Sequence, residues 1–352
     1  MYKFLLILFL SISLQFNSQV NTQLLSNTSW TRVKTIMLDG SRDLSPQSYG
    51  FLVWKIKGNT ICEQIDPWAI ERTKCNDFKI EKNLMKLSDK SNYEIETLTS
   101  DSLIVIQKID GVDFPDQIRK MKFVKTAILV KNFTDKATGD SIVITSRNIT
   151  PTFTKGIVTE LMEIYSQKRY KHNFNVDGEI IIFPRKQEIA VKTDNQKQNT
   201  DNQKSIDLFK VTIQKNYKLW DLTGYENFEK IIVPYTIKSE IKDGSGSLGF
   251  HNKISRRENT SNEIIVNIKD RSVSRENFNK GLKAANSQKY DNAIYFFNKA
   301  HEDDNTNIES LYNVVSISLA QNNTNVACVA LKRLKELEQT QGTKMFNEKC
   351  SK

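Results

Sequence analysis

A 34-residue repeat near the C-terminus is the feature that most constrains how this chain can fold. Four positions recur one repeat length apart: Phe278 and Tyr312, Ala293 and Ala327, Phe297 and Leu331, and Ala300 and Leu334. A period of this length belongs to pairs of antiparallel helices. The sequence therefore predicts stacked helical hairpins over residues 275–352.

Apolar side chains within the repeat are spaced for helix packing. The first helix is expected to present Phe278, Leu282 and Ala285, and the second Ala293, Ile294, Phe297 and Ala300. A solenoid usually needs about three repeats or a cap. Because two repeats are visible, we expect residues 343–350 to form a capping helix.

The run FNKGLKAANSQKYDNAIYFFNKA, residues 278–300, resembles the tetratricopeptide repeat, with Gly281 where the helices approach closely and Tyr290 at the turn. This resemblance implies a concave partner-binding face on the first helix of each hairpin. Its expected residues are Arg275, Phe278, Leu282, Asn286, Glu309, Tyr312 and Ser316. The alternative is that another part of the same chain fills this small, rather apolar groove.

Residues 1–18 have the pattern of a secretory signal peptide: a charged start at Lys3, an apolar run, and a cut expected near Gln19. The apolar run is too short to span a bilayer, and an uncleaved anchor is the alternative. Since the first cysteine is Cys62, a lipoprotein anchor is not expected. We expect an exported chain without a membrane span after signal cleavage. It would be periplasmic or outer-membrane-associated, with secretion as an alternative.

The composition is ordinary for folded protein, with 38% hydrophobic and 26% charged residues, and the length allows two or three domains. The formal net charge of +10 is spread along the chain. Its densest groups, at residues 168–171 and 256–257, lack the interleaved aromatic side chains of a nucleic-acid-binding module. We therefore expect solvated surface and no nucleic-acid partner.

Four cysteines form two groups far apart in the sequence, Cys62 with Cys75 and Cys328 with Cys350. Export permits disulfides, and we expect pairing within each group. Cys328 takes the place of Ile294 one repeat later, so it should face the helix packing, where Cys350 can reach it. Four reduced thiols are the alternative. A zinc site is disfavoured because neither pair has the short C-x-x-C spacing.

Between Trp30 and Leu129 the hydrophobic period is two, which predicts strands. The expected runs are 30–37, 49–57, 78–87, 93–98, 103–109 and 118–124. Turn signals separate them, so we expect an antiparallel meander that can close into a barrel. The layout, from Trp30 to the run RKMKF at 119–123, resembles small lipocalin-like domains of exported bacterial proteins and covers residues 23–135. A ligand cavity and an interior filled by aromatic side chains both stay open.

Residues 149–240 predict a smaller unit that mixes helices and strands. We expect a helix over 156–167, a turn at Asp177 and Gly178, a strand over 179–183, and an exposed polar loop over 194–204. A helical stripe then runs from Ile206 to Trp220. The strand over 230–238 contains Pro234, which predicts an edge or a bulge.

This order, with PTF at 151–153, KLW at 218–220 and IVPYTI at 232–237, resembles the C-terminal domain of TonB-type proteins. The resemblance implies docking by strand addition at a sheet edge around residues 231–237. Two departures argue against an energy transducer: the chain has six prolines in all, too few for a proline-rich spacer, and the usual Tyr-Pro is Tyr170-Lys171. A domain reused for docking fits better.

Residues 241–270 predict a linker, rich in glycine, serine and charge near its start. The pattern G-x-G-x-x-G from Gly244 to Gly249 lacks the apolar helix that a dinucleotide fingerprint requires, so a flexible hinge is expected. No familiar catalytic pattern surrounds the three histidines, His172, His251 and His301, which fall in different predicted units. We expect no enzyme activity, cofactor or metal, and a hydrolase that uses His172 and a nearby acid is a rival hypothesis.

The expected fold class is α+β multidomain: an N-terminal antiparallel meander or barrel, a small α+β unit, and C-terminal all-α hairpins. The expected function is to bind or dock other cell-envelope proteins through the tetratricopeptide-like and TonB-like units. Outer-membrane proteins are candidate partners. The alternative is a carrier that holds a small ligand in the N-terminal barrel.

Overall fold

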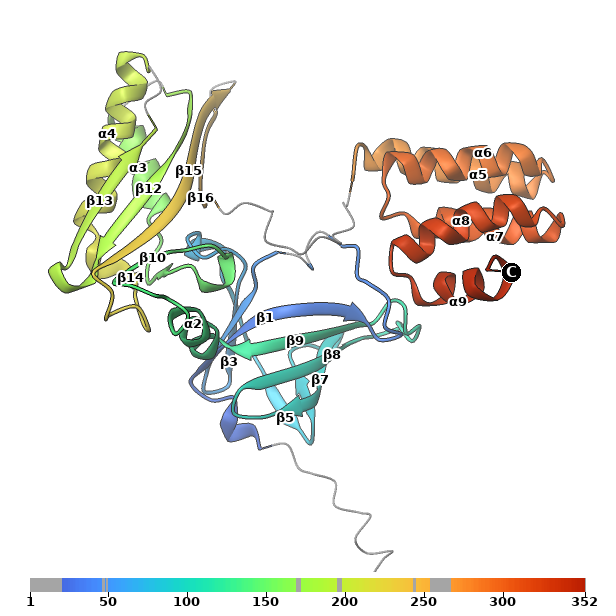
Figure 1. Cartoon of the computed structure of the whole chain (residues 1–352), viewed down its shortest axis with the longest axis horizontal. Coiled ribbons are helices and arrows are strands. Elements are labelled where there is room, and N and C mark those ends of the chain that lie inside the picture. The colour runs from blue at the N-terminus through green and yellow to red at the C-terminus, as the bar shows by residue number, and fades with distance from the viewer. Residues whose placement is uncertain are drawn as a thin grey trace, which may run out of the picture.

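A computed structural model describes residues 21–45, 48, 50–168, 172–194, 198–242, 245–253 and 267–351. Three units follow one another along the chain: a barrel-like sheet, a second sheet covered by helices, and a stack of helices (Figure 1). The mixed multidomain layout is therefore as predicted. The expected signal peptide at residues 1–18 lies outside the described residues.

The first unit is an antiparallel sheet that nearly closes on itself. Its strands are β1 (Thr28–Met37), β2 (Val53–Lys57), β3 (Thr60–Gln64), β4 (Lys74–Asp77), β5 (Lys79–Glu81), β6 (Leu84–Lys86), β7 (Ser91–Leu98), β8 (Ser102–Ile109) and β9 (Arg119–Lys125). Their order is β4-β3-β2-β1-β9-β8-β7-β6-β5. Phe78 alone separates β4, which pairs with β3, from β5, which pairs with β6. The meander thus turns back on itself as a barrel.

Aromatic side chains pack inside this barrel. Trp54 stacks on Phe123 with 4.3 Å between ring centroids, and its ring lies 4.9 Å from that of Tyr93. Trp30 is paired with Trp54 across β1 and β2, so both point to the same side of the sheet. These side chains form a single apolar cluster, and this part of the interior is filled by the protein itself.

Trp68, in the loop between β3 and β4, joins the barrel to the second unit. Its side chain is fully buried in the apolar core of the second sheet. The indole stacks on Phe250 at a centroid distance of 4.4 Å, and its Nε1 donates a hydrogen bond to the Pro151 carbonyl at 3.0 Å. The two units therefore share a core, although the sequence predicts separate domains over 23–135 and 149–240.

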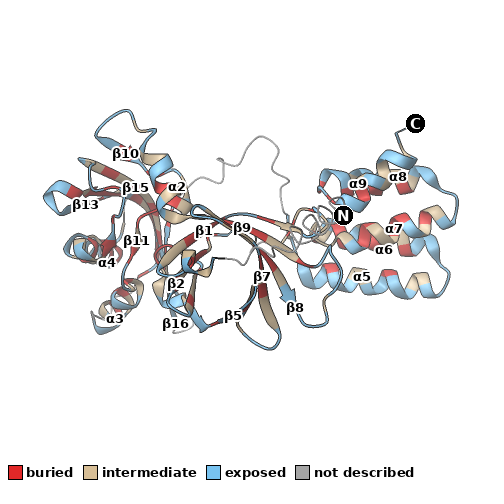
Figure 2. Cartoon of the chain, turned by 90° about the horizontal axis from the view of Figure 1, so that it is seen from below, coloured by how far each residue is buried: buried red, intermediate tan, exposed pale blue. Residues whose placement is uncertain are grey.

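The second unit contains a sheet with α3 and α4 packed against one face (Figures 1 and 2). Its sheet order is β10-β15-β12-β13, with β16 also paired to β15, and β11 and β14 form a separate pair. The elements are α2 (Thr126–Thr134), β10 (Ser141–Val143), β11 (Thr152–Phe153), α3 (Val158–Lys168), β12 (Phe174–Phe183), β13 (Glu188–Thr193), α4 (Thr200–Lys215), β14 (Trp220–Asp221), β15 (Lys230–Lys242) and β16 (Ser245–Asn252). Short 3-10 helices are η2 (Thr22–Leu24), η4 (Ile70–Arg72), η5 (Arg147–Ile149), η6 (Pro184–Lys186) and η7 (Tyr217–Leu219).

The predicted turn at Asp177 and Gly178 is wrong, because both residues lie inside β12. Gly178 is needed for close packing: a Cβ there would lie 2.1 Å from the Lys192 carbonyl oxygen. The Tyr235 ring crosses above this glycine, and its hydroxyl donates to the same oxygen at 3.1 Å.

The polar segment expected as a loop over 194–204 is partly helical. Asn199 caps α4, since its side chain accepts a hydrogen bond from the Asn202 N–H, and the helix begins at Thr200. The helix predicted to reach Trp220 ends at Lys215, and Trp220 lies in β14. Residues 195–197 lie outside the described part of the chain.

The linker expected over 241–270 is also corrected. β15 continues to Lys242 and β16 forms the next strand, with Phe250 buried in the shared core. The flexible hinge expected at Gly244–Gly249 is therefore wrong for Gly246 and Gly249, which lie in β16, whereas Gly244 is not described. Ile268 and Asp304 form an isolated bridge just before the helical stack, and residues 254–266 lie outside the described residues.

The helical stack comprises α5 (Arg271–Asn286), α6 (Tyr290–Asp303), α7 (Ile308–Ala320), α8 (Thr324–Glu336) and α9 (Thr340–Lys349). The buried residues of these helices form one apolar cluster, and buried positions are coloured red along the helices in Figure 2. Gly281 allows close packing, because a Cβ there would lie 2.7 Å from the Phe297 ring. The hairpin turns repeat as well: Gln288 and Asn322, one repeat apart, have φ values of 58° and 59°. α9 occupies the place expected for a capping helix.

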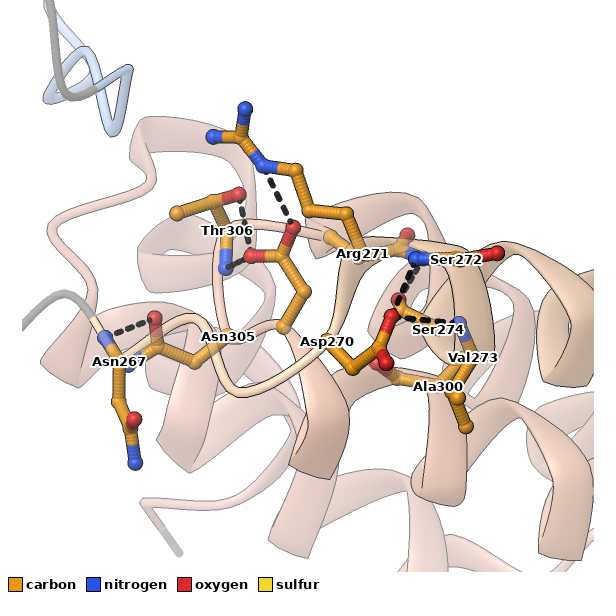
Figure 3. A network of polar contacts seen from close by, with 11 residues as sticks. Asn267, Asp270, Arg271, Ser272, Val273, Ser274, Ala300, Asn305 and Thr306 are labelled. Atoms are coloured by element: carbon orange, nitrogen blue, oxygen red, sulfur yellow. Dashed lines mark hydrogen bonds and ion pairs between the residues drawn. The ribbon is translucent and has the colours of Figure 1, made fainter. Parts of the chain in front are cut away.

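A polar network fixes the start of α5 against the turn between α6 and α7 (Figure 3). Asp270 caps α5 by accepting a hydrogen bond from the Ser272 N–H at 2.8 Å. Asp304 accepts from the Thr306 N–H at 3.0 Å and lies 3.4 Å from the Arg271 Nε. The first hairpin therefore begins at Asp270, five residues before the expected boundary.

Candidate docking surfaces

The edge expected for docking, residues 231–237, is an interior strand. β15 pairs with β12 along one side and with β10 and β16 along the other. The pairing with β10 runs to Ile232, and the pairing with β16 begins at Tyr235. Pro234 lies between them, where its missing N–H interrupts neither ladder. The edge predicted for residues 230–238 is therefore wrong, although the proline does mark a break in pairing.

β16 forms the free edge of the sheet instead. The Lys253 N–H donates to the Pro234 carbonyl at 2.9 Å, which fixes which backbone groups face β15. Because these groups alternate in direction along an antiparallel strand, those of Gly246, Leu248 and Phe250 point away from β15. Within the described part of the chain, these outward N–H and C=O groups have no hydrogen-bond partner.

The two edges of this sheet differ in protection. Natural edge strands are usually shielded by charged residues, proline, bulges or a covering helix. β13 has such protection, since it carries Glu188 and Lys192 and packs beside α4. β16, with the sequence SGSLGFHN, also contacts a helix, α3, but it contains neither a charged residue nor a proline. It is therefore the edge better suited to accept another strand.

Five of the seven residues predicted to bind a partner on the repeats are exposed: Arg275, Leu282, Asn286, Glu309 and Ser316. They lie on α5 and α7, at spacings of four and seven residues that bring them to one side of each helix. Phe278 and Tyr312 are partly buried and pack against the core of the stack. The Phe278 and Phe297 rings have centroids 5.5 Å apart.

A barrel loop contacts the last turn of the helical stack. The Arg42 N–H donates to the Glu338 carbonyl at 3.1 Å, and the Thr340 N–H donates to the Ser41 hydroxyl at 3.0 Å. The Gln339 side-chain amide donates to the Arg42 carbonyl at 3.2 Å. Leu44 is buried in the helical core. The chain itself therefore covers this end of the stack.

Tyr312 lies toward the same barrel loops. Burial raises the pKa of its hydroxyl, a hydrogen bond with the Gly342 backbone opposes the shift, and the carboxylates of Asp39 and Asp116 add to it. Tyr312 is therefore only partly accessible, whereas the five exposed residues of the predicted surface are accessible.

The structure contains both predicted disulfides. Cys62 and Cys75 face each other on β3 and β4. Cys328 on α8 is bonded to Cys350, the residue after α9, so this bridge fastens the capping helix. Both pairings within groups are confirmed, and the alternatives of free thiols and a zinc site are excluded.

A buried serine and histidine meet in the second unit. Ser239 Oγ and His172 Nδ1 form a hydrogen bond, and both residues are buried. Burial lowers the pKa of His172. The three histidines do not lie in three separate units, since His251 is in β16 of the same sheet, while His301 is in α6. Because Ser239 does not reach solvent, the pair is suited to packing rather than to attack on a substrate.

Among the described residues, no group of three or more His, Cys, Asp or Glu side chains is arranged to hold a metal ion. No described helix is long and apolar enough to cross a membrane. Comparison with protein-family models, curated proteins and solved structures finds no match.

Proposed function

We propose that this chain is an exported docking protein that binds other proteins of the cell envelope. The observation that carries the proposal is the open edge of β16, with its outward backbone groups at Gly246, Leu248 and Phe250. An extended segment of a partner can add to such an edge and supply the missing hydrogen bonds. This is the mode implied by the TonB-type resemblance, moved from β15 to β16.

Two further observations support the proposal. The exposed residues Arg275, Leu282 and Glu309 give the tetratricopeptide-like stack a second accessible surface with both charges and an apolar side chain. The two disulfides are typical of proteins that fold in an oxidising compartment, which agrees with an exported chain. The carrier alternative has less support, because Trp54 and Phe123 occupy space inside the barrel.

The edge is tested by replacing Gly246 with proline. The Gly246 N–H points away from β15, and nothing lies within 4 Å of the position of its Cβ. Proline removes this outward donor. Gly246→Ala is the control, because alanine keeps the N–H. In affinity capture from a bacterial envelope extract, we expect Gly246→Pro to lose a partner that Gly246→Ala retains.

The helical surface is tested in the same capture with Leu282→Glu. Leu282 is 38% exposed, so a charge there should disturb binding more than folding. Val273→Glu is the control, since Val273 is equally exposed on α5 but lies nine residues away, on the opposite side of the helix. Loss of a partner with Leu282→Glu alone places recognition on the repeats. Capture of no specific partner, or of partners that all four variants retain, contradicts the proposal.

A further inference from the structure

Two adjoining cavities lie where the barrel meets the second unit. Their volumes are about 370 and 60 Å³, and they share Ser29, Thr126, Val130, Thr150, Thr152 and Asp221 in their walls. The larger one falls in the range of small-molecule sites, about 300 to 1,000 Å³. Sites of this kind often form at domain interfaces. This junction cavity is distinct from β16, from the repeats and from the barrel interior.

One wall of the junction cavity favours negative charge. Lys125, Thr126 and Ala127, where α2 begins, line the larger cavity. α2 has no side-chain cap and no acidic residue in its first turn, so its first N–H groups are available to an anion. Lys55 lines the smaller cavity and is half-buried, without a carboxylate within 4 Å among the described residues. Burial lowers the pKa of Lys55, and the carboxylate of Asp221 opposes this shift.

A second wall contains a hydrogen-bond acceptor that lacks a donor. Gln64 is 1% exposed and lines the smaller cavity. Its Nε2 donates to the carbonyl oxygens of Asp66 and Pro67 at 3.0 and 3.3 Å, which leaves Oε1 without a partner among the described residues. A buried acceptor without a donor is costly, so an N–H or O–H group that reaches Oε1 would be stabilised there. Asp221 accepts a hydrogen bond from the hydroxyl of the exposed Thr223, and its carboxylate adds a negative charge to the same cavity.

We propose that the junction cavity binds a small zwitterion of the α-amino-carboxylate class, a free amino acid or a dipeptide. The ligand carboxylate interacts with the first turn of α2 and with Lys55. The ammonium group and a peptide N–H interact with Asp221 and with Gln64 Oε1. A phosphate fits less well, because its second negative charge would lie beside Asp221.

Isothermal titration of the full chain with L-alanyl-L-alanine tests the proposal. Acetate and ethylamine serve as separate probes for the carboxylate and the ammonium group of the ligand. We expect saturable binding of the dipeptide, tighter than that of either probe. Lys55→Met should weaken it about tenfold, because it removes a charge-assisted contact. Lys57→Met is the matched control: Lys57 is exposed two residues further along the same face of β2, and it does not line either cavity.

A steric variant makes the test independent of charge. Ala127→Trp places an indole in the larger cavity from an exposed position and should abolish binding. Asn132→Trp, exposed on the same helix and outside both cavities, should bind as the unaltered chain does. Thermal melting checks that each variant folds. Absence of saturable dipeptide binding, binding unchanged in both Lys55→Met and Ala127→Trp, or acetate binding as tightly as the dipeptide would each overturn the proposal.

Discussion

The barrel meets its two neighbours through contacts of opposite character. Toward the second sheet it contributes Trp68, a fully buried aromatic side chain, to an apolar core that spans both units. Toward the helical stack it contributes one buried apolar residue, Leu44, and hydrogen bonds between residues 41–42 and 338–340. The first junction is a continuous core, and the second is a small and mainly polar contact.

This difference predicts different cooperativity. Units that share a core lose it together, so the barrel and the second sheet should unfold in one transition. The helical stack has its own core around Phe297, Leu311 and Leu331, so it can separate from the barrel and unfold in a second transition. The substitutions below act on one junction or one core at a time.

Trp68→Ala should have the largest effect. The substitution removes a fully buried ring that stacks on Phe250, which costs about 3 to 5 kcal/mol of the free energy of unfolding. Hydrogen exchange during denaturant unfolding should show the barrel and second sheet destabilised together, with the helices unchanged. Phe114→Ala is the control, because Phe114 is 66% exposed. If only one of the two units loses protection, the shared core does not couple them.

Removing the bridge between Cys328 and Cys350 should act on the helical stack alone. The bridged cysteines are 22 residues apart, and closure of such a loop contributes about 3 kcal/mol in the chain-entropy model. With both cysteines replaced by serine, we expect faster exchange in α8 and α9 and a lower melting temperature for the helical transition. Replacing Cys62 and Cys75 is the matched comparison and should move the barrel transition. Movement of both transitions by either pair would contradict separate unfolding.

Leu44→Ala should loosen the contact between barrel and helices. Loss of this buried side chain costs about 2 kcal/mol or more. Because Leu44 comes from the barrel and packs in the helical core, the substitution should destabilise the contact between the barrel and the helices. Small-angle X-ray scattering should show a larger radius of gyration, and residues 338–340 should exchange faster. Val33→Ala, at an exposed position of β1, is the control. An unchanged scattering curve would mean that the hydrogen bonds alone hold the stack in place.

The elements predicted well are those whose apolar residues repeat regularly. The strand around Tyr93 and Ile95 and the hairpins around Phe297 and Leu331 follow periods of two and of about 3.6 residues, and each lies where the sequence predicts it. The disulfide pairings followed from separation along the chain and from the place of Cys328 in the repeat. These signals are local, or they recur, so one sequence is enough to detect them.

The elements missed depend on distant partners. β16 contains two glycines and two apolar residues, Leu248 and Phe250, so it resembles a linker until β15 is placed beside it. α2 follows β9 directly, without a turn signal. Trp68 bonds to Pro151, 83 positions away, and only the tertiary fold shows that its loop enters another core. For the same reason the sequence predicts a sheet edge at residues 231–237, whereas those residues lie in the interior strand β15 and β16 forms the free edge.

Lowering the pH should have the smallest effect on stability. One buried histidine in each region allows the loss of stability to be assigned to that region. Burial is the main cause that lowers the pKa of both His172, in the second unit, and His301, in α6, below the ordinary value of 6.5. For His301 the carbonyl of Asn307 opposes the shift and Arg333 adds to it.

A histidine with a lowered pKa in the folded state binds more protons when unfolded, so its contribution to stability is complete above about pH 6.5 and decreases as the pH falls. Urea unfolding at pH 7.5, 6.5 and 5.5 should therefore show both transitions weakening toward low pH. His301→Gln should flatten the pH dependence of the helical transition, and His172→Gln that of the other. If either substitution flattens the pH dependence of both transitions, protonation in one unit affects the other through Leu44 and its hydrogen-bonded neighbours. The polar junction would then couple the units more strongly than its contacts suggest.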